Sequence, residues 1–311
     1  MVNARANVGA PSKSPLTYGL FSVAEMRRST DPHWKNGVTW RNVCPDAGST
    51  YDECISPLSL GVTGLSEVPA KAATAEISIW GATPFTVVVE IDCAPVGDYW
   101  NTAQELVNTT FTQAEQQEVE GIFWSGVVAD TAGIAYPHLA SATTLSETEP
   151  GGATLQLTTA SLAPSGGGSL DVVEALGKLE QAMSACIKGK GVVHIRCELL
   201  PHLKANHLLE EENGVFYTPG GHKLAVSAGY LGSAPDGSVQ VGVSWMYGTG
   251  PVFLYTSNGR FIGERKESMD LDVNTLKRIY ERTYVAGFDC CLFAVPVSTG
   301  GVTTGAIDSA T

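Results

Sequence analysis

The sequence has no lysine or arginine among the 106 residues between Lys71 and Lys178, yet this stretch contains thirteen aspartates and glutamates. The formal net charge of the chain is −13, from 32 acidic and 19 basic residues. The nineteen acids outside the stretch balance the nineteen bases, so the stretch holds the whole excess. A surface this negative repels a phosphate backbone. The composition therefore argues against sequence-specific binding of nucleic acid, but not against a protein that encloses it.

Long apolar runs are also absent. No run approaches the roughly 20 residues that a membrane-spanning helix needs, so we expect no membrane partner. The first 21 residues lack the continuous apolar core of a secretory signal. We therefore expect the chain to be made and folded in a cytoplasm.

None of the seven cysteines forms a CxxC pair, which argues against zinc ribbons and thioredoxin-like redox sites. Most of them are interpreted as small buried apolar side chains, including Cys186, Cys197 and the adjacent Cys290 and Cys291. Cys44 and Cys54 differ, because they flank the turn-rich segment CPDAGSTYDEC. A local disulfide between these two is a candidate, with reduced thiols as the alternative.

The motifs of common enzymes are missing as well. There is no GxSxG elbow, HExxH pair, phosphate-binding GxxxxGK[ST] loop or EF-hand loop. His194, His202 and His222 are the candidates for the cleft of a soluble hydrolase, and His194, His202 and His207 for a metal site; satisfied or exposed histidines are the simpler interpretation. We expect no catalytic residue, metal or cofactor.

The strongest positive pattern is a strand followed by a long helix. The β-branched segment TPFTVVVEIDC predicts a strand from Thr83. From about Asp98 to Trp124, apolar residues recur at steps of three and four, which predicts a helix some 40 Å long. We expect Leu106, Val107 and Phe111 to face a sheet, and the glutamates at 105, 115, 118 and 120 to form a solvated face. The apolar positions of this helix include Trp100, Leu106, Val107, Phe111 and Phe123.

Before the strand, residues 33–82 are rich in Pro, Gly and Ser and show no sustained periodicity. Such a segment favours an extended arm or long hairpin packed on another subunit, with Trp34 and Trp40 as interface anchors. A loop folded back on its own core is the alternative. After the long helix, the pattern predicts a compact unit of a helix from Ser169, a strand at 192–197, a short helix and a hairpin turning at Pro219–Gly221. Further strands, a helix over Asp272–Arg282 and a final strand follow.

This order of elements resembles the major capsid proteins of tailed double-stranded DNA phages, whose Hong Kong 97-type fold bacterial encapsulins share. Residues 98–124 resemble the spine helix of that family. The segments GVVHIRCELLPHLKANHLLEEENGVFYTPGGHKLAVSAGY and SWMYGTGPVFLYTS resemble its A-domain and closing strands. The segments TGPVFLY and ERTYVAGFDC especially resemble segments of the capsid proteins of phages that infect actinobacteria.

The resemblance implies an α+β fold with five regions. These are an N-arm (1–32), an E-loop (33–82), the first part of a P-domain (83–168), an A-domain (169–240), and P-domain return strands, a helix and the C-terminal tail (241–311).

The resemblance also implies a function. The chain would be a major capsid protein that assembles into hexamers and pentamers, forming the icosahedral head around double-stranded DNA. Its partners would be further copies of itself, a separate scaffolding protein, a portal, and DNA held without sequence specificity; it would be located in the virion and assembled in the host cytoplasm. Some relatives cross-link a lysine of the E-loop to a neighbour, but here only Lys35 and Lys71 are available and no partner can be assigned, so we expect no covalent network. The alternatives are an encapsulin-like shell around a protein cargo, and the hydrolase named above.

Overall fold

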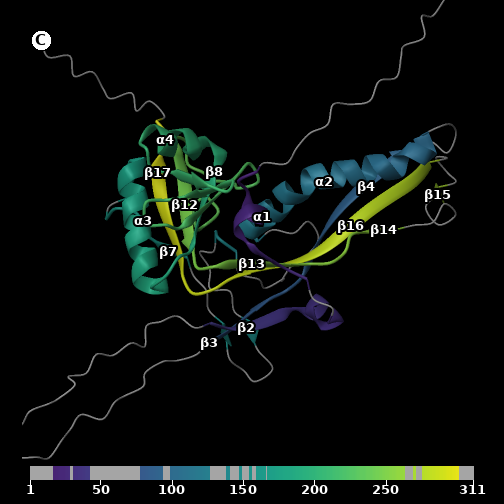
Figure 1. Cartoon of the computed structure of the whole chain (residues 1–311), viewed down its shortest axis with the longest axis horizontal. Helices are drawn as coiled ribbons and strands as arrows, with labels where there is room; N and C mark the ends of the chain where they lie inside the picture. Colours follow the sequence, from purple (N-terminus) through teal and green to yellow (C-terminus); the bar gives the residue numbers. More distant parts are fainter. Residues whose placement is uncertain are drawn as a thin grey trace, which may run out of the picture.

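The computed structural model describes residues 17–28, 31–42, 78–93, 99–126, 138–140, 147–148, 154–155, 159–165, 167–262, 269–270 and 275–300. These residues form a compact unit around a seven-stranded sheet and an elongated unit around a six-stranded sheet, with one long helix running along the latter (Figure 1). A small hairpin lies on the other side of the elongated sheet (Figure 1).

The elongated unit is organised by β16 (Thr275–Phe288), a strand of 14 residues. β4 (Phe85–Cys93) pairs with it antiparallel over nine positions. β13 (Val252–Thr256), β14 (Arg260–Ile262) and β15 (Met269–Asp270) also pair with it, and β1 (Glu25–Arg27) extends the sheet in parallel with β13. Helix α2 (Tyr99–Ser125) contacts both β4 and β16, so it covers one face of this sheet.

The compact unit has the strand order β7-β17-β12-β8-β11-β10-β9. Helix α3 (Val172–Ile187) contacts β12 and β17, and Asp171 caps its first turn by accepting from the backbone N–H groups of Val173 and Glu174. The short helices are η2 (Cys197–Leu199) and α4 (Leu200–Ala205). The strands are β7 (Ala160–Ser161), β8 (Val192–Arg196), β9 (Glu210–Glu212), β10 (Val215–Tyr217), β11 (Lys223–Ser227), β12 (Val243–Thr249) and β17 (Leu292–Ser298).

Two small hairpins and two short N-terminal elements complete the described chain. β2 (Val38–Asn42) pairs with β3 (Ser78–Ala82), and β5 (Glu147–Thr148) pairs with β6 (Thr154–Leu155). The β2–β3 pairing places Val38 opposite Ala82, so the two ends of the predicted arm pair with each other, while residues 43–77 lie outside the described residues. The N-terminal elements are helix α1 (Leu20–Val23) and the 3-10 helix η1 (Pro32–Asn36).

Several sequence predictions hold at this level. The long helix predicted over 98–124 is observed over Tyr99–Ser125, and Gly126 follows it in a left-handed conformation (φ 73°). The hairpin at Pro219–Gly221 is also confirmed, since β10 and β11 pair antiparallel around it. Within the described residues, no helix combines the length and the hydropathy needed to cross a lipid bilayer.

Two predictions about the last seventy residues are wrong. The expected helix over Asp272–Arg282 is strand β16 from Thr275 onward, because pairing with β4 and β14 satisfies its backbone and outweighs the local pattern. The region 241–311 also does not belong to one unit. β12 and β17 lie in the compact sheet, whereas β13 and β16 lie in the elongated one, so the chain crosses between the sheets more than once.

Candidate functional site: the buried joint of helix α2

Helix α2 is buried on different sides along its length. In its first half, Val107 and Phe111 are buried, and Phe111 packs edge-on against Tyr280 of β16, with ring centroids 4.7 Å apart. In its second half, Phe123 and Trp124 are fully buried against residues of the compact unit. The helix is therefore held by both units. We call the buried contacts around residues 115–124 of α2 the joint.

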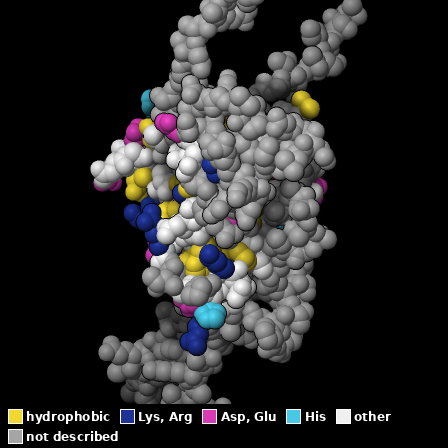
Figure 2. Space-filling view, turned by 90° about the vertical axis from the view of Figure 1, so that its right-hand side faces the viewer, with side chains coloured by type: hydrophobic (Ala, Val, Ile, Leu, Met, Phe, Trp, Pro, Cys, Tyr) yellow, Lys and Arg dark blue, Asp and Glu magenta, His cyan; other side chains and the backbone are white. Residues whose placement is uncertain are grey.

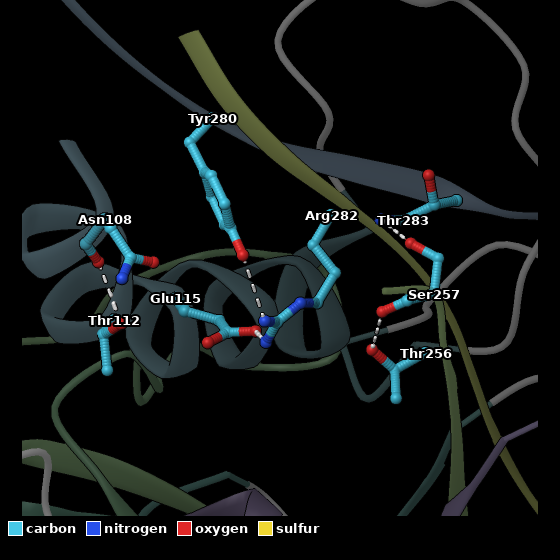
Figure 3. Close-up of polar contacts among 8 residues, drawn as sticks. All are labelled: Asn108, Thr112, Glu115, Thr256, Ser257, Tyr280, Arg282 and Thr283. Carbon is cyan, nitrogen blue, oxygen red and sulfur yellow. Dashed lines mark hydrogen bonds and ion pairs between the residues drawn. The ribbon is translucent and has the colours of Figure 1, made fainter. Parts of the chain in front are cut away.

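The first polar contact of the joint is an ion pair between α2 and the elongated sheet. The guanidinium of Arg282 on β16 donates to the carboxylate of Glu115, and Figure 3 shows the two side chains directed toward one another. Arg282 also lies over the ring of Phe111, 5.4 Å from its centroid, and donates to the hydroxyl of Tyr280 at 3.5 Å. Burial raises the pKa of Glu115, although Arg282 acts in the opposite direction.

The second polar contact is a buried carboxylate that binds three segments of the chain. Glu120 is 1% exposed. It accepts from the backbone N–H of Leu20 at 2.6 Å, from Gln116 Nε2 at 3.0 Å, and from the hydroxyl of Ser227 at the end of β11. Burial raises the pKa of Glu120, while these hydrogen bonds lower it. Glu120 thus links α2, the N-terminal segment and the compact sheet.

Two glycines lie close to α2 near this carboxylate, Gly229 against its backbone and Gly19 against the side chain of Gln116. A Cβ at Gly229 would lie 2.4 Å from the carbonyl oxygen of Gln117, and one at Gly19 would lie 1.5 Å from Gln116 Nε2. Any larger residue at Gly229 would push the compact unit away from the backbone of α2. The absence of a side chain at Gly229 therefore allows the compact unit to lie this close to the backbone of α2.

The end of α2 is fixed by aromatic rings and their hydrogen bonds. The indole Nε1–H of Trp124 donates to Ser233 Oγ, and the hydroxyl of Tyr247 donates to the carbonyl of Ser233, both at 2.9 Å. The rings of Trp124 and Tyr247 meet edge to face with centroids 4.7 Å apart. Ser233 therefore aligns the last turn of α2 with strand β12.

His194 is a structural residue of the same joint. Its imidazole is fully buried and lies between the hydroxyls of Tyr230 and Thr249, at 3.0 Å from each. Burial lowers the pKa of His194 to about 3, so the ring is neutral at physiological pH. Phe123 packs beside it, with ring centroids 5.5 Å apart.

The N-terminal segment runs across the joint from one unit to the other. The ring of Tyr18 stacks on Phe216 with centroids 4.1 Å apart, and the carbonyl of Tyr18 accepts from the N–H of Val226. Leu20 and Val23 are buried in the core that α2 and β16 share. Residues 25–27 then join the elongated sheet as β1. We call residues 17–27 the strap.

The structure corrects several predictions for α2. Val107, Phe111 and Phe123 are buried as expected, but Leu106 is 49% exposed and does not face the sheet. The glutamates do not form one solvated face, because Glu115 and Glu120 are buried. Their burial is possible because an arginine, a backbone N–H and two side-chain donors satisfy their carboxylates. The side chain of Trp100 lies outside the described residues.

The two predicted interface tryptophans contact their own chain. Trp34 is 7% exposed, packs with Ala82 and Val285, and stacks on Tyr255 at 6.2 Å. Trp40 is partly buried and meets Phe253 edge-on at 5.0 Å. The prediction that Trp34 is buried by a neighbouring subunit is therefore wrong, since the elongated sheet already covers it.

The cysteine predictions have different outcomes. Cys186 is not a simple buried thiol, because it forms a disulfide with Cys291. Cys290 is buried as predicted. The candidate pair Cys44 and Cys54 lies outside the described residues.

The histidines do not gather into a catalytic or metal site. His194 is buried at the joint, His202 is exposed on α4, and His222 is buried where its Nδ1 accepts from the backbone N–H of Gly191. Among the described residues, no group of three or more His, Cys, Asp or Glu is placed to hold a metal ion. The three histidines of the hydrolase hypothesis therefore lie in different surroundings, one sealed at the joint, one exposed, and one bonded to the backbone of Gly191.

Known structures share this arrangement over nearly their whole length. A chain from the capsid of a native GTA particle superposes with a TM-score of 0.53 at 12% identity, covering 96% of both chains. A chain from Mycobacterium phage Ogopogo superposes with a TM-score of 0.52 at 14% identity, covering 95% of this chain and 97% of that one. No protein-family model and no curated protein matches the sequence. The chain has the α+β capsid fold of the Hong Kong 97 type that its sequence predicts.

Proposed function

We propose that this chain is a major capsid protein that assembles into hexamers and pentamers and builds an icosahedral phage head around double-stranded DNA. The observation that carries the proposal is the extent of the structural match, which leaves about 5% of either chain uncovered. A partial match would be consistent with a shared domain placed in an unrelated protein. Here the match is too extensive to leave out the long helix or either sheet.

The joint supports the same proposal through its mechanics. A shell subunit must keep a fixed angle between its parts, because a small angular error repeated around a ring prevents closure. Helix α2 is held at Glu115 by one sheet and at Trp124 by the other, and Glu120 adds the strap. These contacts suit a rigid strut better than a gated enzyme, so we propose a structural role without catalysis.

The remaining parts of the proposal concern regions and partners. In this reading the strap belongs to an N-arm, the β2–β3 hairpin is the base of an E-loop, the elongated unit is the P-domain and the compact unit is the A-domain. The partners are further copies of the chain, a scaffolding protein, a portal, and DNA without sequence specificity. Assembly takes place in the host cytoplasm, and the mature location is the virion.

Native mass spectrometry of the purified 32.7 kDa chain tests the proposal. We expect species of five and six copies, from the chain alone or after addition of the scaffolding protein that we propose as its partner. The variant Gly229→Val, which would push the compact unit off the backbone of α2, should lose these species, whereas Gly177→Ala, at an exposed position of α3 with open space around it, should keep them. A chain that stays monomeric at every concentration and with its scaffold would overturn the proposal.

A further inference from the structure

The chain passes between the two sheets at two adjacent points. β12 of the compact sheet leads to β13 of the elongated sheet through Gly250 and Pro251, and β16 leads back to β17 through Asp289, Cys290 and Cys291. The N–H of Asp289 donates to the carbonyl of Pro251 at 3.1 Å, so the crossings are bonded to each other. A Cβ at Gly250 would lie 1.9 Å from the carbonyl oxygen of Asp289. We call these residues, 250–251 and 289–291, the crossover.

A disulfide ties the crossover to the compact unit. Cys291 is its last residue, and Cys186 lies in the last turn of α3, with the two Cα atoms 6.3 Å apart. The bond closes a loop of chain in which the cysteines are 105 positions apart. A cross-link across so long a loop removes more freedom from an open chain than a short one does. Here the loop includes strands β8, β11 and β12 of the compact sheet and strands β13 and β16 of the elongated one.

We propose that Cys186 and Cys291 form a redox-sensitive link that holds the crossover to the compact unit. The two residues are free thiols while the subunit is assembled, and they form the disulfide after the particle leaves the cell. Cytoplasm keeps thiols reduced, and the medium outside permits disulfides. The change of compartment rests on the proposed function. The chemistry of the pair and its effect on the crossover do not.

The exposure of the two side chains determines the order of the chemical steps. Cys291 is 5% exposed, whereas Cys186 is only partly buried and is the one that a small oxidant reaches first. The thiolate of Cys186 attacks a low-molecular-weight disulfide RSSR, forming Cys186–S–S–R and releasing RS⁻. The thiolate of Cys291 then attacks the Cys186 sulfur and expels a second RS⁻. The two thiol protons pass to the two RS⁻ groups, so one RSSR is reduced to two RSH.

Cys290 provides a built-in control for the assignment. It is adjacent to Cys291 and buried, and its backbone N–H donates to Asp289 Oδ1 at 3.0 Å. No lysine or arginine follows Arg282, so Cys290 and Cys291 lie on the same tryptic peptide. The variant Cys290→Ala leaves Cys291 as the only cysteine of that peptide and makes the linkage unambiguous.

The experiment compares the unassembled chain after incubation with oxidised glutathione and after incubation with a phosphine reductant. We expect a tryptic cross-link between the Cys186 and Cys291 peptides in wild type and Cys290→Ala, only after oxidation. Hydrogen exchange at residues 183–188 and 286–292 should be about tenfold slower in the oxidised form. In Cys186→Ala, the exchange should be equally fast under both conditions.

Two results would overturn the inference. One is the absence of the cross-link in oxidised Cys290→Ala, and the other is a cross-link that leaves hydrogen exchange at the crossover unchanged. Because the test uses the unassembled chain, a failure to form shells would affect the proposed function alone. If shells form normally from a chain that lacks this redox response, the proposal of a redox-sensitive link is wrong and the proposed function stands.

Discussion

The carboxylate of Glu120 accepts a hydrogen bond from the backbone N–H of Leu20 at 2.6 Å, across one hundred residues of chain. The same carboxylate accepts from Ser227, which ends strand β11 of the compact sheet. A buried acid without an arginine or lysine among its hydrogen-bond donors therefore holds together the strap, the long helix and the compact unit. The stability of this arrangement depends on whether the carboxyl is protonated.

The first prediction is the pH dependence that follows. Burial raises the pKa of Glu120 above its ordinary value of 4.5, so the folded chain binds this proton more tightly than the unfolded chain. The stability that the Glu120 carboxyl contributes is fully present below its pKa in the unfolded chain. It is lost as the pH rises through its pKa in the folded chain. Glu120→Gln should reduce the loss of stability as the pH rises above 4.5, as measured by urea denaturation. The matched control is Glu118→Gln, two positions earlier and exposed; parallel curves for wild type and Glu120→Gln would contradict the account.

The second prediction concerns the ion pair of the joint. Arg282→Met leaves the buried carboxylate of Glu115 without its cation and should cost about 3 kcal/mol of unfolding free energy. Adding Glu115→Gln should recover much of this loss, because no buried charge then remains unpaired. Lys178→Met removes the exposed pair with Glu174 on α3 and should cost about 0.5 kcal/mol or less. Equal losses at the two sites, measured by chemical denaturation, would show that burial does not distinguish them.

The third prediction separates the side chain of Leu106 from the helix that carries it. Leu106→Ala should change stability little, since the side chain is 49% exposed. Leu106→Pro should cost about 3 kcal/mol, because proline removes a backbone hydrogen bond and clashes one turn earlier. It should also bend α2 and prevent shells from closing. Electron microscopy of both variants measures this, and shells of normal size from Leu106→Pro would refute the strut role of α2.

The fourth prediction concerns Trp34. Because its indole is buried by its own chain, Trp34→Ala should destabilise the unassembled subunit by about 3 kcal/mol. Thermal unfolding at low protein concentration, where subunits remain apart, measures this effect. An unchanged melting temperature combined with impaired assembly would restore the interface role first expected for this residue.

Elements with a local sequence pattern could be predicted from the sequence. Contacts between segments far apart in the chain could not. The 27-residue helix α2 could be predicted because its apolar residues recur every three or four positions over about seven turns. Gly126 then marks its end. Strand β16 was not, because LDVNTLKRIYER also fits a helix and only its pairing with β4 decides the outcome. The register that places Tyr280 opposite Val89 is a property of two segments far apart in sequence.

The polar contacts of the joint could not be predicted from the sequence for a related reason. Glutamates spaced along an amphipathic helix ordinarily face water. Nothing within α2 indicates that Arg282 and Leu20 return from distant segments to satisfy Glu115 and Glu120. The disulfide between Cys186 and Cys291 was missed likewise, since a separation of 105 residues carries no local signal.

The most direct test of the central claim is electron microscopy of the purified chain, expressed alone and together with the scaffolding protein proposed as its partner. The account predicts closed icosahedral shells of uniform size whose walls are built from hexamers and pentamers, with α2 as an unbroken helix in every subunit. A monodisperse single subunit, or open aggregates without icosahedral symmetry, would contradict it.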